Sequence, residues 1–203
     1  MHTQTKETQS VLTPQSVLEM MKEGNKRFLS KSVADRDHHQ QVKDTSTGQY
    51  PMAVVLSCID SRVPVEIIFD KGIGDVFSAR VAGNIVNEDI LGSIEYSCKV
   101  AGSKVVIVLG HTKCGAVTAA CQHTELGNIT ALLSKIMPAV DELVKPDMEL
   151  TSEVIEAVVV LNVKNAMELI RKDSPILKEM EDNGEIEIVG AVYDVSSGEI
   201  NYL

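Results

Sequence analysis

The chain has 203 residues, and 44% of them are hydrophobic, which is enough for a single domain with a buried core. Its formal net charge is −10 and no run of one sign stands out, so nucleic-acid and membrane-surface partners are disfavoured and a small, neutral substrate fits better. No segment approaches the ~18 apolar residues of a membrane-spanning helix, and the N-terminus lacks the apolar stretch of an export signal. The four cysteines therefore predict reduced thiols in a cytoplasmic protein, available for metal binding or catalysis.

The N-terminal segment 1–48 has little apolar core of its own. Residues 1–12 show no periodicity and predict a flexible arm. Thr13 is placed to cap a helix that runs to Leu29, with Pro14 at its first position. The polar residues that follow have room for a second short helix. Because such an arm must pack against something, we expect it to contact another subunit.

From residue 51 onward the pattern alternates between buried strands and helices. Strands are predicted at 52–57, 75–80, 103–109, 185–193 and 199–203. Helices are predicted at 64–69, 88–100 and 115–120, and two or three more within 125–182, the longest at 151–172. The β-branched run at 103–109 is typical of a strand buried on both faces of a parallel sheet. The sequence thus predicts one α/β domain over 1–203, with a helical arm at 1–48, a core at 49–124 and covering helices and C-terminal strands at 125–203.

Metal-ligand residues follow two of the predicted strands. Cys58 and Asp60 come directly after the strand at 52–57, and His111 and Cys114 follow the run at 103–109. Sites in open α/β sheets form beyond the carboxyl ends of the strands, so these side chains are expected to meet. Zinc accepts thiolate, imidazole and carboxylate ligands. Either half alone is a weak signal, but the two together predict a zinc site built into the core.

The role of Asp60 separates a structural zinc ion from a catalytic one. If Asp60 is the fourth ligand, the site is closed; if it turns away, the fourth position is open to water. Arg62 gives it a reason to turn away, because a guanidinium can hold a carboxylate through two parallel hydrogen bonds. Asp60 could then accept a hydrogen bond from a zinc-bound water, which ionises near neutral pH. A non-enzymatic structural zinc protein, or a redox protein that uses Cys58 and Cys114, remains an alternative.

The two motifs resemble the signatures of the β-class carbonic anhydrases, Cys-x-Asp-x-Arg and His-x-x-Cys-Gly. The segments 58–64 and 110–115 both fit, and the similarity extends over 49–120, including 79–84. The resemblance implies a sheet of four parallel strands with an added antiparallel C-terminal strand, flanked by helices. It also implies a homodimer, with tetramers formed from dimers, in which the N-terminal helices embrace the neighbouring subunit.

The resemblance further implies a role for individual residues. One zinc ion per chain would be held by Cys58, His111 and Cys114, with Asp60 and Arg62 as a catalytic dyad. The plant-like subtype has a Gln, a Phe and a Tyr in its substrate pocket, and the matching residues of this chain are Gln49, Phe77 and Tyr96. In the other subtype a Trp and a Gly precede the first Cys, whereas Val55 and Ser57 stand there in this chain. The plant-like, open-site subtype is therefore expected, without the inhibitory bicarbonate pocket of the other.

The implied activity is the reversible hydration of carbon dioxide to bicarbonate and a proton, by attack of zinc hydroxide. The substrates would be carbon dioxide and bicarbonate, with no nucleic acid and no membrane as partner. An alternative on the same fold is a hydrolase of carbon disulfide or carbonyl sulfide, which a narrowed entrance would be expected to distinguish.

Overall fold

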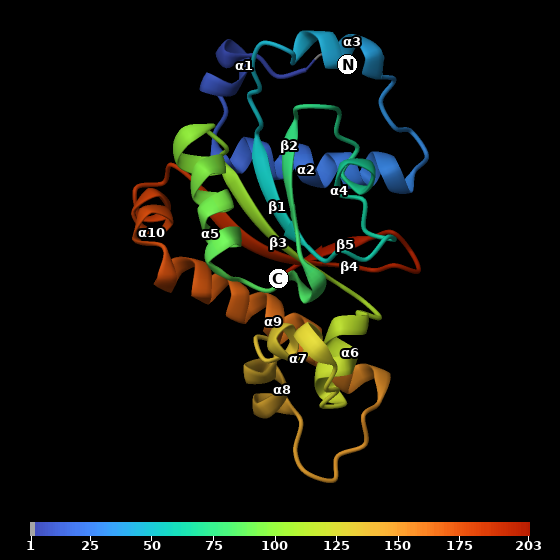
Figure 1. Cartoon of the computed structure of the whole chain (residues 1–203). Coiled ribbons are helices and arrows are strands. Elements are labelled where there is room, and N and C mark those ends of the chain that lie inside the picture. The colour runs from blue at the N-terminus through green and yellow to red at the C-terminus, as the bar shows by residue number, and fades with distance from the viewer. Residues whose placement is uncertain (1–2) are drawn as a thin grey trace.

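A twisted sheet lies at the centre of the chain (Figure 1). The structure is a computed structural model that describes residues 3–203, and within them the sheet has five strands in the order β2-β1-β3-β4-β5. The strands are β1 (Ala53–Ser57), β2 (Val76–Arg80), β3 (Val105–His111), β4 (Glu187–Tyr193) and β5 (Ile200–Tyr202). Strands β1 to β4 are parallel and β5 is antiparallel to β4. This confirms the predicted α/β fold with four parallel strands and one antiparallel C-terminal strand.

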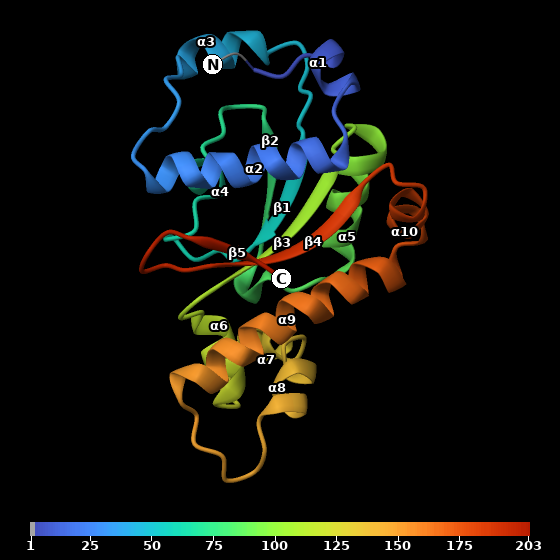
Figure 2. The ribbon, with the colours of Figure 1, turned by 180° about the vertical axis from the view of Figure 1, so that it is seen from behind.

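Helices cover both faces of this sheet. They are α1 (Lys6–Ser10), α2 (Pro14–Leu29), α3 (His38–Asp44), α4 (Val65–Ile68), α5 (Glu88–Glu95), α6 (Gly115–Cys121), α7 (Gly127–Leu133), α8 (Met137–Leu143), α9 (Ser152–Asp173) and α10 (Pro175–Asp182). A 3₁₀ turn, η1 (Ala82–Asn84), and a π-helical turn, η2 (Tyr96–Val100), complete the set. Figure 2 shows α2 crossing one face, while α5, α9 and α10 lie against the other.

Alternation along the two central strands fills both layers of the core. On β1, Val55 packs with the layer under α2 and α4, whereas Val54 and Leu56 pack with the layer under α5, α9 and α10. Every residue of β1 and β3 is buried, as the β-branched run predicted. A third cluster packs α6, α7 and α8 against α9, below the carboxyl ends of the strands.

The register fixes where the strands end. Ser57 of β1 lies opposite Leu109 of β3 on one side and Arg80 of β2 on the other. The residues that follow β1 and the last residues of β3 therefore emerge at the same edge of the sheet, which places the two sequence motifs side by side.

The N-terminal segment agrees with the sequence in part. Thr13 caps α2 through a capping box, Pro14 is its first residue, and the polar segment after it contains the short helix α3. The flexible arm predicted for 1–12 is wrong over α1, where Thr5 caps one helical turn. A single turn is too short to show periodicity, and the buried Gln9 amide anchors it by donating to the carbonyls of Pro51 and Ala101. Residues 1–2 of that segment lie outside the described part.

Two helical expectations need correction. The segment 125–182 holds four helices within the described chain rather than two or three, because α7 and α8 are separate pieces of seven residues each. Pro138 lies in the first turn of α8, where the missing N–H costs nothing. The helix predicted at 88–100 changes from α to π geometry at Tyr96. No helix in residues 3–203 combines the length and the apolar character needed to span a membrane.

Candidate metal centre

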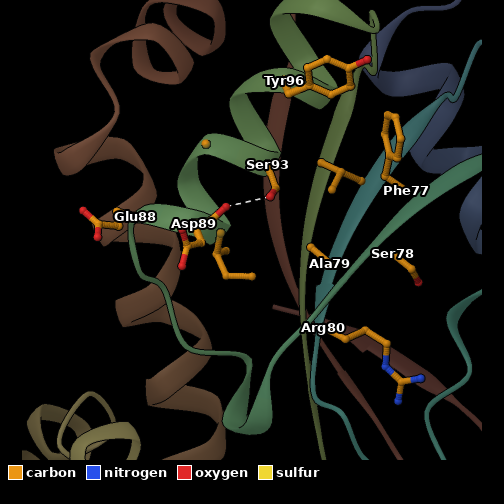
Figure 3. A pocket seen from close by; sticks show the side chains of 11 residues that line it. Phe77, Ser78, Ala79, Arg80, Glu88, Asp89, Ser93 and Tyr96 are labelled. Atoms are coloured by element: carbon orange, nitrogen blue, oxygen red, sulfur yellow. Dashed lines mark hydrogen bonds between the residues drawn. The ribbon is translucent and has the colours of Figure 1, made fainter.

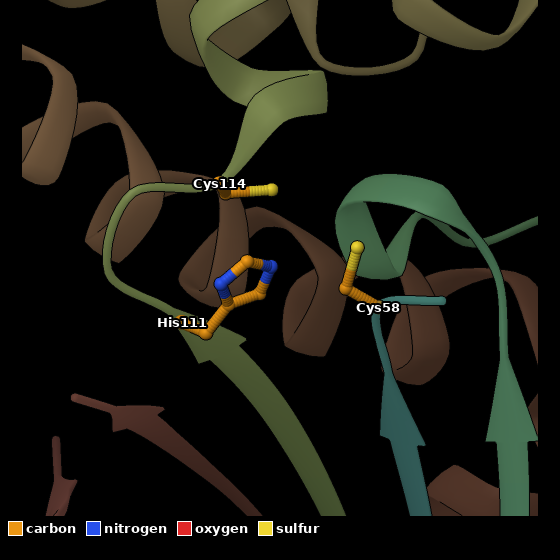
Figure 4. Close-up of side chains that lie close together, drawn as sticks. All are labelled: Cys58, His111 and Cys114. Atoms are coloured by element: carbon orange, nitrogen blue, oxygen red, sulfur yellow. The ribbon is translucent and has the colours of Figure 1, made fainter. Parts of the chain in front are cut away.

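Three potential metal ligands converge where β1 and β3 end. Cys58 directly follows β1, His111 is the last residue of β3, and Cys114 is the N-cap of α6 (Figure 4). All three side chains are buried, and their ligating atoms lie within 4.8 Å of one another. Within residues 3–203 this is the one group of three or more such side chains close enough to share an ion.

The imidazole of His111 has the orientation of a metal ligand. Its Nδ1 lies 2.9 Å from the carbonyl oxygen of Thr112, and because a carbonyl only accepts hydrogen bonds, Nδ1 carries the proton. The lone pair of the neutral ring is then on Nε2, which is buried and has no hydrogen-bond partner. Figure 4 shows this nitrogen directed between the two sulfur atoms. A buried lone pair without a partner, beside two thiols, fits a zinc ion, and fixing the other ring nitrogen on a carbonyl is common among zinc ligands.

The two thiols differ strongly in acidity. A hydrogen bond from the Cys114 thiol holds the pKa of Cys58 well below its ordinary value, against the effect of burial, and the imidazole of His111 adds to this. The same contact and burial raise the pKa of Cys114. Burial alone would lower the pKa of His111, but its contact with Cys58 raises it. The pocket thus stabilises one negative charge before any cation binds, and a divalent cation would favour the second thiolate.

Asp60 is adjacent to the three ligands but is held by Arg62. The backbone N–H and the Nε of Arg62 each donate to Oδ1 over 2.9 Å, and Nη2 donates to Oδ2 over 2.7 Å. This bidentate contact lowers the pKa of Asp60 to about 2, so the carboxyl group stays ionised. Its Oδ2 lies 3.9 Å from Nε2 of His111. Asp60 therefore borders the ligand group with its charge already compensated by Arg62.

Residues distant in sequence hold the two ligand loops in place. Arg80 of β2 donates to the carbonyls of Cys58 (3.0 Å) and Asp60 (2.6 Å). In the second loop the backbone N–H of Lys113 donates to the Glu156 carboxylate of α9 over 2.8 Å. These supports are not predictable from the sequence, because they act on backbone atoms and no local pattern reports such contacts. The sequence signal that pointed toward Arg80 was the family resemblance of the segment 79–84, which contains this residue.

The three predicted substrate-pocket residues lie away from the ligand group in this chain. Phe77 and Tyr96 pack edge to face, with ring centroids 6.2 Å apart, and line an open pocket of about 750 Å³ between β2 and α5 (Figure 3). None of the three ligands lines that pocket, and neither does Gln49, which is exposed. Tyr96 is 53% exposed. A single chain does not bring these residues to the metal centre, and their role remains a prediction.

The chain is similar to carbonic anhydrases both in sequence and in structure. The family model described as carbonic anhydrase matches residues 53–200. Carbonic anhydrase 2 of Mycobacterium tuberculosis is 35% identical over 91% of this chain and 90% of its own length. A carbonic anhydrase of Pseudomonas aeruginosa is 31% identical over 81% of this chain and 78% of its own length. Among solved structures, the β-carbonic anhydrase CafA of Aspergillus fumigatus superposes with a TM-score of 0.74 at 27% identity, covering 93% of this chain and 89% of that one.

Proposed function

The chain belongs to the carbonic anhydrase family, and on that premise we propose that it catalyses the reversible hydration of carbon dioxide to bicarbonate and a proton, with zinc as its cofactor. The observation that carries this proposal is the unpartnered Nε2 of His111 between two cysteines, with Asp60 paired to Arg62 beside them. Cys58, His111 and Cys114 would hold one zinc ion. When bound, zinc supplies a Lewis acid that activates water near neutral pH, for which carbonic anhydrases are the standard example.

Asp60 and Arg62 would act on the reacting water. Arg62 compensates the charge of Asp60 and fixes its plane, which keeps the carboxylate ionised and restricts its rotation. A lone pair on Oδ2 remains available on the side that faces His111. There it can accept a hydrogen bond from the reacting water and so orient the water's own lone pair toward the substrate carbon. This division of labour favours the plant-like, open-site subtype.

Gln49, Phe77 and Tyr96 would contribute to the substrate pocket only in an oligomer. We propose a homodimer, because β2 is an edge strand with no fully buried residue, and Tyr96 beside it is largely exposed. Tetramers built from dimers remain a proposal as well. A chain from crystal structures described as two tetrameric β-carbonic anhydrases of Sordaria macrospora shares the fold, with a TM-score of 0.73 at 23% identity. Light scattering coupled to size-exclusion chromatography measures the assembly directly.

A cytoplasmic location is also a proposal. It is supported by four free cysteines, three of which are at most 2% exposed, a pattern typical of proteins kept in a reducing compartment. Cell fractionation with compartment markers tests it.

The activity is tested by stopped-flow hydration of carbon dioxide with zinc-loaded protein. A rate above that of buffer, with about one zinc per chain, supports the proposal. Absence of such a rate at that zinc content contradicts it. Release of hydrogen sulfide from carbon disulfide or carbonyl sulfide by the same preparation tests the hydrolase alternative, and that activity without hydration would favour it.

A further inference from the structure

The sulfur of Cys58 receives a backbone hydrogen bond from the turn that follows β2. The N–H of Gly83 points at Sγ of Cys58 over 3.3 Å, and both residues are buried. Gly83 has φ 67° and ψ 18°, in the left-handed region that favours glycine. A Cβ at this position would lie 2.6 Å from Cδ1 of Ile136. The turn is therefore built around a residue without a side chain, whose N–H faces a proposed metal ligand.

The carbonyl of the same glycine is held by a side chain from another part of the fold. Nδ2 of Asn162, in the middle of α9, donates to the carbonyl oxygen of Gly83 over 2.9 Å. Asn162 is only 4% exposed. A buried amide in a helix interior is costly unless it is paired. This amide makes its contact at a residue whose N–H reaches the Cys58 sulfur.

The contact with Asn162 restrains the turn that carries the Gly83 N–H. The N–H and the C=O of Gly83 belong to successive peptide planes that meet at its Cα. Because glycine has the widest conformational freedom of any residue, holding its carbonyl limits the conformations of the turn and favours the one in which the N–H faces the sulfur. An N–H donated to a thiolate favours the charged form and withdraws charge from the sulfur. Contacts of this indirect kind commonly tune the affinity and electronic properties of a metal site.

We propose that Asn162 is a positioning residue of the metal centre, which orients the Gly83 N–H toward the Cys58 sulfur and thereby strengthens zinc binding. The inference rests on the proposed function, in that it takes Cys58 to be a zinc ligand. Asn162 itself contacts neither zinc nor substrate. It adds no charge to the buried site, so it adjusts the sulfur without competing with the two thiolates for the cation.

Asn162→Leu tests this role, because it keeps the approximate volume of the side chain and removes the donor. Zinc affinity is measured by competition with a chromophoric chelator, and the cobalt-substituted protein supplies the thiolate-to-cobalt charge-transfer band. We expect the zinc dissociation constant to rise about 10-fold. The band is expected to move to longer wavelength, because a sulfur that has lost its hydrogen bond gives up charge more readily.

Two control variants separate positioning from general packing. Asn165→Leu makes the same substitution on the same helix, at a residue that lines a pocket between α8 and α9 to which Gly83 does not contribute. Ile170→Val loosens a fully buried contact of α9 farther along the helix. Both are expected to leave the cobalt band and the zinc dissociation constant unchanged, even where Ile170→Val lowers the unfolding midpoint. A band shift of similar size in Ile170→Val would assign the effect to packing and overturn the proposal.

The remaining outcomes are also decisive. A cobalt band and a zinc affinity in Asn162→Leu that match the unsubstituted protein overturn the proposal while leaving the hydratase function intact. Failure of the unsubstituted protein to bind zinc or hydrate carbon dioxide counts against the proposed function instead. One further measurement needs no variant and therefore holds even if Asn162→Leu does not fold. In the ¹¹³Cd-substituted protein, the Gly83 amide proton should show scalar coupling to cadmium through the Cys58 sulfur. Absence of that coupling removes the hydrogen bond on which the proposal depends.

Discussion

Replacing the Asp60 carboxylate by an amide should strongly reduce the hydration activity and leave the fold and the zinc site almost unchanged. Asp60→Asn keeps the shape of the side chain but deletes the charge and turns one acceptor oxygen into a donor. The Asp60 and Arg62 side chains are 18% and 48% exposed, so solvent screens the pair and its loss should cost about 1 kcal/mol of unfolding free energy or less. Loss of a positioned group of this kind lowers turnover about 100-fold, which corresponds to about 2.7 kcal/mol of transition-state stabilisation. The expected effect on activity thus exceeds the effect on stability.

Three assays on Asp60→Asn separate these effects: stopped-flow hydration, zinc content after dialysis and urea unfolding. Zinc should remain bound, because the Asp60 oxygens are committed to Arg62 and not to the three ligands. Asp182→Asn is the matched control, since it makes the same change in an exposed ion pair with Lys178 and should leave hydration unchanged. Turnover within about threefold of the unsubstituted protein would refute the role given to Asp60. Loss of zinc from Asp60→Asn would instead identify Asp60 as the fourth ligand of a structural site.

Changes at Cys114, in pH and at Gly83 test other parts of the site. Cys114→Ser should lower zinc affinity at least about 10-fold and abolish hydration. Its circular dichroism spectrum should stay native, because the sheet core under α2 and α5 does not depend on this side chain. An unfolded zinc-free variant would instead support a structural ion. The pKa of Asp60 is depressed from 3.8 to about 2, so the stability contributed by its pair with Arg62 is fully present above pH 3.8 and is lost as the pH falls toward 2. The urea unfolding midpoints of the unsubstituted protein and of Asp60→Asn should therefore converge in acid. A difference between the two midpoints that stays constant with pH would contradict this role of the ion pair. Gly83→Ala should cost about 2 kcal/mol or more in unfolding free energy, because it places a Cβ at φ 67° and against Ile136; a midpoint unchanged in urea would show that the turn accommodates a side chain.

The sequence predicted those parts of the fold that have strong local patterns. The run at 103–109 contains consecutive β-branched residues, and its residues 105–109 lie in β3, which is buried along its whole length and extends two residues farther, to His111. Because parallel strands share one carboxyl edge, residues after β1 and at the end of β3 could be expected to meet, and Cys58 and His111 do so. The helix α1 and the separate helices α7 and α8 are too short for a periodic signal, so they were missed or undercounted.

The supports of the site could not be predicted, for a different physical reason. Arg80, Glu156 and Asn162 all act on backbone atoms of segments far away in the chain. Every residue except proline has the same backbone carbonyl and N–H, so the sequence does not show which backbone group a side chain will contact. The pocket residues Phe77 and Tyr96 were placed by resemblance alone, and in one chain they lie outside the ligand group.

A structure of the zinc-loaded protein at neutral pH would show directly whether Asp60 or water occupies the fourth zinc position. We expect zinc to be bound by Cys58, His111 and Cys114, with both Asp60 oxygens still on Arg62 and solvent at the fourth position. A carboxylate oxygen of Asp60 bound to the zinc ion would close the site to water and refute the catalytic role proposed for Asp60.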